Sequence, residues 1–200
     1  QRQMCIRDRP MPNHPLRIVV TGASSGIGLA VSEALASQGH TVIGLSRRGY
    51  SSHNGTSSFP NLSQLACDIS NWTEVENVAA SIANTHESID ALICCAALQG
   101  EIRPALDADP ILWQQTIQTN LCGTYFPIRA FAPLLRKAQR RAKILCFSGG
   151  GASRARPNFA AYAASKTGVV RLVETIASEN VDQPLDINAI APGAIPTFCL

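Results

Sequence analysis

Tyr162 and Lys166 are the two residues of this chain whose types and spacing point most directly to chemistry. On a helical wheel of about 100° per residue, Lys166, Val169, Val173 and Ile176 all fall within about 40° of Tyr162. A lysine in such an inward stripe is costly to bury without a partner or a task. The alternatives are an ammonium that reaches solvent from the edge of the stripe, or a spacing that arose by chance.

A spacing of four residues places a phenol and an ammonium on adjacent turns of a helix. At about 5 Å and an effective dielectric constant of about 20, the attraction between phenolate and ammonium is about 3 kcal/mol. That attraction lowers the pKa of a phenol, which is about 10 in isolation, by about two units. Such a phenol can donate and accept a proton near neutral pH. A hydroxyl at the end of the preceding strand, such as that of Ser148, could polarise a carbonyl oxygen beside it.

The second chemical feature is a glycine-rich turn at 21–28, Thr-Gly-Ala-Ser-Ser-Gly-Ile-Gly. Its three glycines, Gly22, Gly26 and Gly28, allow positive φ and let the backbone approach a ligand with no Cβ in the way. The helix that starts at about Gly26 then directs unpaired N–H groups at an anion. The alternative is an ordinary strand-to-helix turn that is rich in glycine and serine.

The hydrophobic pattern predicts the elements that position these residues. Short apolar and β-branched runs predict strands at 16–20, 41–45, 62–67, 89–95, 143–147 and 185–190. Helical periodicity predicts helices at about 26–38, 71–84, 110–137 and 159–180, the third bent near Gly123 and Pro127. This alternation predicts an α/β fold with a three-layer, doubly wound parallel sheet, whose ligands bind at the carboxyl ends of the strands.

Composition and charge indicate the number of domains and the kinds of partner to expect. A chain of 200 residues with 46% apolar and 16% charged residues predicts one soluble domain, over 16–200. Residues 1–15 contain three prolines and no periodicity, and we expect them to be disordered or extraneous. The remainder has 14 basic and 13 acidic residues, so we expect neither nucleic acid nor a membrane surface as a partner.

No apolar run approaches the roughly 18 residues of a membrane span, and no secretory signal is evident, so we expect a cytoplasmic protein. The seven cysteines are odd in number and lack metal-ligand spacing. We therefore expect free thiols and no metal site.

Together, these features resemble the short-chain dehydrogenase/reductase family. The resemblance covers residues 16–200 and rests on motifs that occur in order, namely Thr-Gly-x-x-x-Gly-x-Gly at 21–28, Asp68, Asn120, Tyr162-x-x-x-Lys166 and Pro192-Gly193. It implies a Rossmann fold and an oxidoreductase that moves a hydride between a nicotinamide and a carbonyl or secondary alcohol. By family analogy, it also implies a homodimer or homotetramer.

The resemblance assigns roles to particular residues. Tyr162 would be the catalytic acid/base, Ser148 would bind the reacting oxygen, Lys166 would tune the phenol and hold the nicotinamide ribose, and Asn120 would hold a water in the proton relay. Asp68 would contact adenine. The full set of cofactor-binding residues would be Gly22, Ser24, Ser25, Gly26, Ile27, Gly28, Arg47, Asp68, Ile69, Ala96, Tyr162, Lys166, Pro192, Gly193, Ile195 and Thr197.

The end of the second predicted strand favours NADP(H) over NAD(H). An acidic residue there would bind the ribose 2′-hydroxyl and repel a 2′-phosphate, whereas this chain has Ser46 followed by Arg47 and Arg48. The alternative is two solvated arginines on an exposed loop.

The chain departs from the family pattern in three places. Cys-Cys-Ala-Ala at 94–97 replaces the usual Asn-Asn-Ala-Gly, which removes an amide that steadies the sheet. Counting thirteen residues back from Tyr162, the usual position of the family's serine holds Gly149, with Ser148 beside it and Ser153 as a weaker candidate. The chain also stops soon after the Pro-Gly motif, so we expect a C-terminal truncation without the last strand and helix.

Two other functions are compatible with these departures or motifs. A non-catalytic NADP-binding or scaffold protein of the same fold would account for the serine offset and for 94–97. A nucleotide-sugar epimerase shares Tyr-x-x-x-Lys but usually has Gly-x-x-Gly-x-x-Gly in its first turn, which argues against it. Arg154 and Arg156 could attract an acidic substrate, although solvated surface arginines are the favoured interpretation. The sequence does not determine the substrate.

Overall fold

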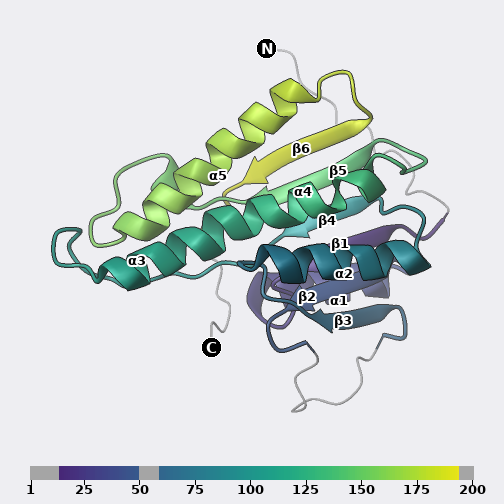
Figure 1. The fold of residues 1–200 in the computed structure, drawn as a ribbon, viewed down its shortest axis with the longest axis horizontal. Coiled ribbons are helices and arrows are strands. Elements are labelled where there is room, and N and C mark those ends of the chain that lie inside the picture. Colours follow the sequence, from purple (N-terminus) through teal and green to yellow (C-terminus); the bar gives the residue numbers. More distant parts are fainter. Residues whose placement is uncertain (1–13, 50–58, 194–200) are drawn as a thin grey trace.

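The computed structural model describes residues 14–49 and 59–193, and these form a parallel β-sheet flanked by helices (Figure 1). The strands are β1 (Arg17–Thr21), β2 (Thr41–Ser46), β3 (Leu62–Ala66), β4 (Ala91–Cys94), β5 (Ala142–Phe147) and β6 (Leu185–Ile190). They lie in the order β3-β2-β1-β4-β5-β6, and every pair is parallel. This confirms the predicted doubly wound sheet. The chain reverses its direction of progress between β1 and β4, where such sheets open a crevice for a ligand.

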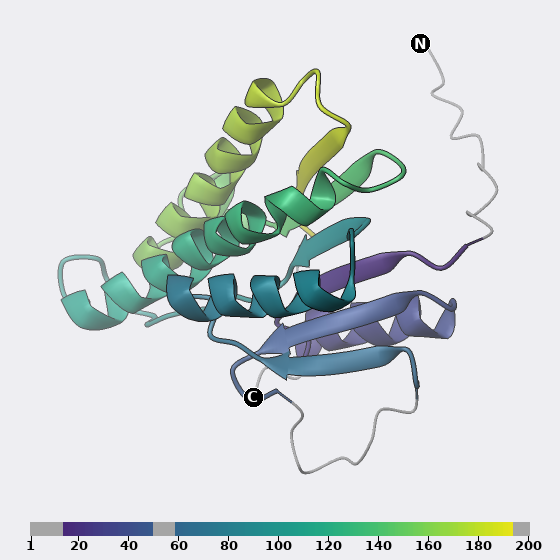
Figure 2. The same cartoon turned by 45° about the vertical axis from the view of Figure 1, so that its right-hand side comes forward.

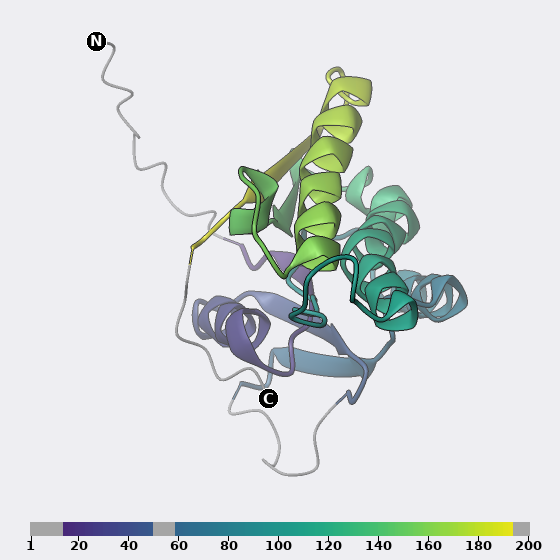
Figure 3. The same ribbon diagram turned by 90° about the vertical axis from the view of Figure 1, so that its left-hand side faces the viewer.

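Helices cover both faces of the sheet. They are α1 (Gly26–Ser37), α2 (Trp72–Thr85), α3 (Pro110–Ile117), α4 (Gly123–Leu135) and α5 (Ala160–Glu179). The view in Figure 3 separates α1, on one side of the sheet, from α2, α4 and α5, on the other. In Figure 2, α2, α4 and α5 follow one another across their face of the sheet, and α3 extends beyond it.

The two hydrophobic cores follow from the alternation of side chains along each strand. On β1, Val19 belongs to the core under α2, α4 and α5, whereas Ile18 and Val20 belong to the smaller core under α1. All three side chains are at most 3% exposed. A strand buried on both faces needs an apolar run without polar interruptions, which is what the sequence supplies at β1.

The predicted bounds hold to within two residues, and the largest difference is at β4. The strand is Ala91–Cys94 rather than 89–95. Ile89 is fully buried, but its backbone N–H donates to the carbonyl of Leu134 on α4 instead of to a neighbouring strand. Burial without ladder hydrogen bonds explains why an apolar run overestimates the strand.

The helix predicted at 110–137 is interrupted earlier than expected. The interruption is a π-helical turn at Gln118–Cys122, where the backbone N–H of Gly123 donates to the carbonyl of Gln118. The regular helix resumes at Gly123 and passes through Pro127. Single π turns are common at functional sites, and this one contains the predicted site residue Asn120.

Within 14–49 and 59–193, no helix is both long and apolar enough to cross a membrane. The cysteines in these ranges, Cys67, Cys94, Cys95, Cys122 and Cys146, are all free thiols.

Candidate active site

A cavity of about 680 Å³ lies at the carboxyl ends of the central strands. It is lined by the glycine-rich turn, by the ends of β2, β3 and β4, and by Tyr162 on α5. Its lining residues are Gly22, Ser24, Ser25, Gly26, Ile27, Gly28, Leu45, Ser46, Arg47, Arg48, Cys67, Asp68, Ile69, Ser70, Cys95, Ala96, Ala97, Leu98, Gln99, Gln115, Thr119, Arg156 and Tyr162. The predicted ligand crevice is therefore present where the strand order reverses.

The glycine-rich turn requires its glycines. Gly22 has φ of 71°, and a Cβ built on it would come 2.8 Å from the Cα of Ala96, at the end of β4. A Cβ on Gly28 would come 2.2 Å from the carbonyl oxygen of Gly22. Ser25 precedes α1, and its hydroxyl makes no capping hydrogen bond. These close contacts fix the shape of the turn, which offers the Ser25 hydroxyl and a helix N-terminus to an anion.

Lys166 is buried in the inward stripe of α5. Its side chain is 3% exposed, and Val169 and Val173 of the same stripe are buried as well. The ammonium Nζ donates to the carbonyl of Phe147 at 2.8 Å and lies 5.8 Å from the centroid of the Tyr162 ring. This burial excludes the alternative in which Lys166 reaches solvent from the edge of the stripe.

The surroundings of Lys166 are poor in compensating charge. Burial lowers the pKa of the Lys166 ammonium from 10.5 to about 8, and the thiols of Cys146, Cys94 and Cys95 oppose this shift. Cys94 and Cys146 are partners on neighbouring strands, and both are buried. The Lys166 amine beside Tyr162 therefore has a pKa of about 8, which is close to neutral pH.

Ser148 and Gly149 meet α5 in different ways. The Ser148 hydroxyl is buried and donates to the carbonyl of Lys166 at 3.2 Å, and its backbone N–H donates to Ile190 at 2.8 Å. Gly149 faces Tyr162, since a Cβ built on it would come 2.6 Å from the phenol Oη. The structure therefore places Gly149, and not the Ser148 hydroxyl, against the Tyr162 oxygen.

Asn120 is fully buried behind the cavity. Its Oδ1 accepts from the backbone N–H of Leu98 at 2.7 Å, and its Nδ2 donates to the Leu98 carbonyl at 2.9 Å and to the Ser165 hydroxyl at 3.0 Å. Both amide protons of the side chain are thus engaged. Asn120 fixes Leu98, which lines the cavity, and connects it to the helix that carries Tyr162.

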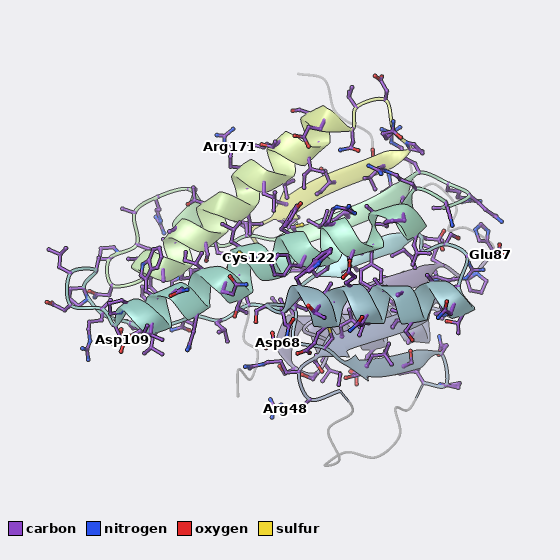
Figure 4. All side chains as sticks on the ribbon, in the orientation of Figure 1. Arg48, Asp68, Glu87, Asp109, Cys122 and Arg171 are labelled. Atoms are coloured by element: carbon purple, nitrogen blue, oxygen red, sulfur yellow. The ribbon has the colours of Figure 1, made fainter. Side chains whose placement is uncertain are left out.

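The far end of the cavity contains the residues predicted for the adenosine part of a dinucleotide. Arg47 and Arg48 follow β2 and are exposed, and Asp68 and Ile69 follow β3. Figure 4 shows Arg48 and Asp68 on the same side of the molecule. The Asp68 carboxylate accepts from the backbone N–H and hydroxyl of Ser70, at 2.9 and 2.7 Å, which fixes its orientation.

Some predicted site residues are not brought to the cavity in the described part of the chain. Pro192 and Gly193 are exposed and do not line it. Ile195 and Thr197 lie outside the described residues. Conversely, the sequence did not identify Leu98 and Ser165 as the partners of Asn120, because no local sequence pattern predicts a hydrogen bond between distant segments.

Comparisons with known proteins agree with this geometry. The family model for short chain dehydrogenase matches residues 17–200. Uncharacterized oxidoreductase YciK of Escherichia coli (strain K12) is 33% identical over 190 residues, which cover 90% of this chain and 73% of that protein.

Solved structures give the same result. Aldohexose dehydrogenase of Thermoplasma acidophilum, in ligand-free form, has a TM-score of 0.83 and 28% identity, over 92% of this chain and 69% of that one. A protein of Escherichia coli CFT073, described as a short chain dehydrogenase complexed with NADPH, has a TM-score of 0.78 and 31% identity, over 89% of this chain and 76% of that one.

Proposed function

This chain belongs to the short-chain dehydrogenase/reductase family, oxidoreductases that act on CH–OH groups with a nicotinamide cofactor, and from this premise we propose that it interconverts a carbonyl and a secondary alcohol with NADP(H). The observation that carries the proposal is the buried Lys166, one helical turn from Tyr162 at the wall of the cavity. A buried amine beside a phenol is a costly arrangement that acid–base chemistry explains.

The glycine-rich turn fits a dinucleotide. Its three glycines line the cavity together with Ser24 and Ser25. Gly22, Gly26, Gly28 and the N-terminus of α1 would hold the pyrophosphate. When bound, the nicotinamide supplies or accepts the hydride.

Arg47 and Arg48 support NADP(H) over NAD(H). Both line the cavity at the end of β2, where an acidic residue would instead select the ribose 2′-hydroxyl. A guanidinium offers a planar fork of donors to a phosphate. We infer that Arg47 binds the 2′-phosphate, with Asp68 and Ile69 beside the adenine, and Ile195 and Thr197 at the nicotinamide end.

Tyr162 is the proposed proton donor to the substrate oxygen in the reductive direction. Lys166 holds a positive charge near the phenol and donates to Phe147, so its ammonium is fixed in place. We propose Ser148 as the second donor to that oxygen. For this role its hydroxyl, which donates to the Lys166 carbonyl, must rotate toward the cavity. Asn120 stays the predicted holder of a relay water. Because its side-chain protons bond Leu98 and Ser165 and its backbone carbonyl already accepts from the Thr124 hydroxyl at 2.7 Å, a relay water would have to use a second lone pair of Oδ1 or of that carbonyl.

The test is a screen of aldehydes, ketones and secondary alcohols on the full chain, with NADPH and NADH assayed side by side. We expect turnover with a preference for NADPH. Tight binding of NADPH without turnover of any substrate would instead support the non-catalytic alternative, which family membership does not favour. A clear preference for NADH would contradict the role given to Arg47.

The assembly is a separate proposal. We infer a homodimer or homotetramer by family analogy, with the helices that carry Asn120 and Tyr162 at the interface. Exposed apolar side chains on α3 and α4, those of Ile111, Leu112, Trp113 and Tyr125, are consistent with a covered surface. Light scattering after size exclusion measures the state directly, and a monomer at micromolar concentration would contradict the inference.

A further inference from the structure

Arg156 stands at the tyrosine end of the cavity. It lines the same cavity as Tyr162, and its guanidinium carbon lies 5.6 Å from the centroid of the Tyr162 ring. The other two lining arginines, Arg47 and Arg48, follow β2 at the opposite end. The cavity therefore has positive charge where the proposed chemistry takes place as well as where the 2′-phosphate would bind.

The guanidinium of Arg156 is held in place before any ligand binds. It stacks over the Phe159 ring at 3.8 Å from the centroid, a contact that favours one orientation of the planar group. The Arg156 carbonyl accepts from the backbone N–H of Phe159 at 3.2 Å. The loop is also tied to a second segment, because the Asn158 carbonyl accepts from the backbone N–H of Arg103 at 2.9 Å.

The charge of Arg156 is available to a ligand. Within 14–49 and 59–193, none of the ion pairs or side-chain hydrogen bonds involves its guanidinium. Among the described residues that line the cavity, Asp68 is the one carboxylate, and it follows β3 and accepts from Ser70. Arg154, two residues away in the same loop, does not line the cavity and serves as a natural comparison.

We propose that Arg156 binds a carboxylate of the substrate, so that the substrate is a small oxo acid or the corresponding hydroxy acid. This inference rests on the proposed function, in which the carbonyl oxygen lies at Tyr162 Oη. The planar fork of one arginine matches a carboxylate through two parallel hydrogen bonds. Gly149, which contributes no side-chain donor, lies against Tyr162 and leaves Arg156 as the charged donor nearest the phenol among the lining residues. Arg156 is exposed, as a solvated arginine would be, but its guanidinium lies over the Phe159 ring at the cavity wall, where a ligand carboxylate can reach it.

The test compares short 2-oxo and 3-oxo acids with their methyl esters, which keep the carbonyl and lose the charge. The full chain is assayed with saturating NADPH as the wild type, Arg156→Gln, Arg156→Lys and the control Arg154→Gln. We expect the ratio of kcat/KM for acid over ester to fall about 10- to 100-fold in Arg156→Gln, as for loss of a charge-assisted hydrogen bond. The acid-over-ester ratio of Arg156→Lys should lie between those of the wild type and Arg156→Gln. Arg154→Gln should change the ratio less than about threefold.

Three outcomes would overturn the inference. An equal fall in kcat/KM for acid and ester in Arg156→Gln would mean that the arginine only supports the loop. A higher KM for NADPH in that variant would mean that it contacts the cofactor. Turnover of esters without any preference for acids in the wild type would exclude a carboxylate site.

Failure of the proposed function has a different signature, namely no turnover of any carbonyl. In that case, calorimetric titration of the NADPH-saturated protein with butanoate and with butanamide still tests whether Arg156 binds a carboxylate. We expect butanoate to bind more tightly in the wild type and Arg154→Gln, and to lose this advantage in Arg156→Gln. Equal binding of the two probes to the wild type would overturn the carboxylate site.

Discussion

The Tyr162 hydroxyl lies directly over the backbone of Gly149, so closely that a Cβ at residue 149 would come 2.6 Å from Oη and 3.1 Å from a ring carbon. Gly149 has an extended backbone, with φ of −163°, so its need for glycine is steric and not conformational. The position of the proposed catalytic phenol thus depends on the absence of a side chain on a neighbouring loop.

Gly149→Ala should displace Tyr162. Because a methyl cannot occupy the space taken by Oη, the ring must move, and misplacement of a catalytic group by about 1 Å costs up to roughly 100-fold in rate. We expect kcat to fall about 10- to 100-fold with the KM for NADPH little changed. Gly150→Ala is the control, since a Cβ there meets nothing within 4 Å. Equal kcat values for the two variants would show that Tyr162 adjusts at no cost.

Tyr162→Phe should abolish turnover while the affinity for NADPH stays within a few-fold. The change removes the proton donor and acceptor but keeps the ring and its packing, so fluorescence titration with NADPH separates binding from chemistry. Tyr125→Phe is the matched control, because it removes the same hydroxyl from a tyrosine on α4 that does not line the cavity. Turnover above about one-tenth of the wild-type value in Tyr162→Phe would rule out the proposed mechanism.

Arg47→Ser should weaken the binding of NADPH and leave the binding of NADH unchanged. Loss of a charge-assisted hydrogen bond to the 2′-phosphate predicts a rise of about 10- to 100-fold in the KM for NADPH. The KM for NADH serves as the internal control, since NADH has no phosphate at this position, and Arg48→Ser shows whether the neighbouring arginine shares the task. A parallel rise for both cofactors would place Arg47 in a structural role instead.

Lys166 should make stability depend on pH. Its pKa is about 8 in the folded protein and 10.5 in the unfolded chain, so the unfolded chain binds more protons between these values. The free energy of unfolding should therefore rise as pH increases from about 8 to about 10.5, by about 3 kcal/mol at most. Urea unfolding of the wild type and Lys166→Met at pH 7.5 and pH 10 isolates this effect, because other titrating groups cancel in the difference.

The stability of the wild type relative to Lys166→Met should increase with pH. A difference that is constant across this range would show that the lysine is not destabilised by burial. The absolute stability of Lys166→Met is a poorer guide, because removal of the ammonium also leaves the Phe147 carbonyl without its donor.

The sequence by itself determined the parallel sheet, the glycine-rich turn and the inward position of Lys166. These features depend on local periodicity: apolar runs predict strands, their alternation with helices predicts parallel pairing, and helical spacing places Lys166 in line with Val169. The glycine turn was also predictable, since the positive φ of Gly22 and the contact between Gly28 and the Gly22 carbonyl both arise within one short segment.

Only the tertiary structure decided which groups meet at the site. Asn120 bonds Leu98 and Ser165, which are 22 and 45 positions away along the chain, and Ser148 bonds the carbonyl of Lys166 instead of facing the phenol. Counting residues from Tyr162 could not choose between Ser148 and Gly149, nor place Arg156 over Phe159 at the cavity wall. Such contacts depend on how loops from different strands pack against α5, and hydrogen-bond direction and steric fit are set by that packing and not by spacing in the sequence.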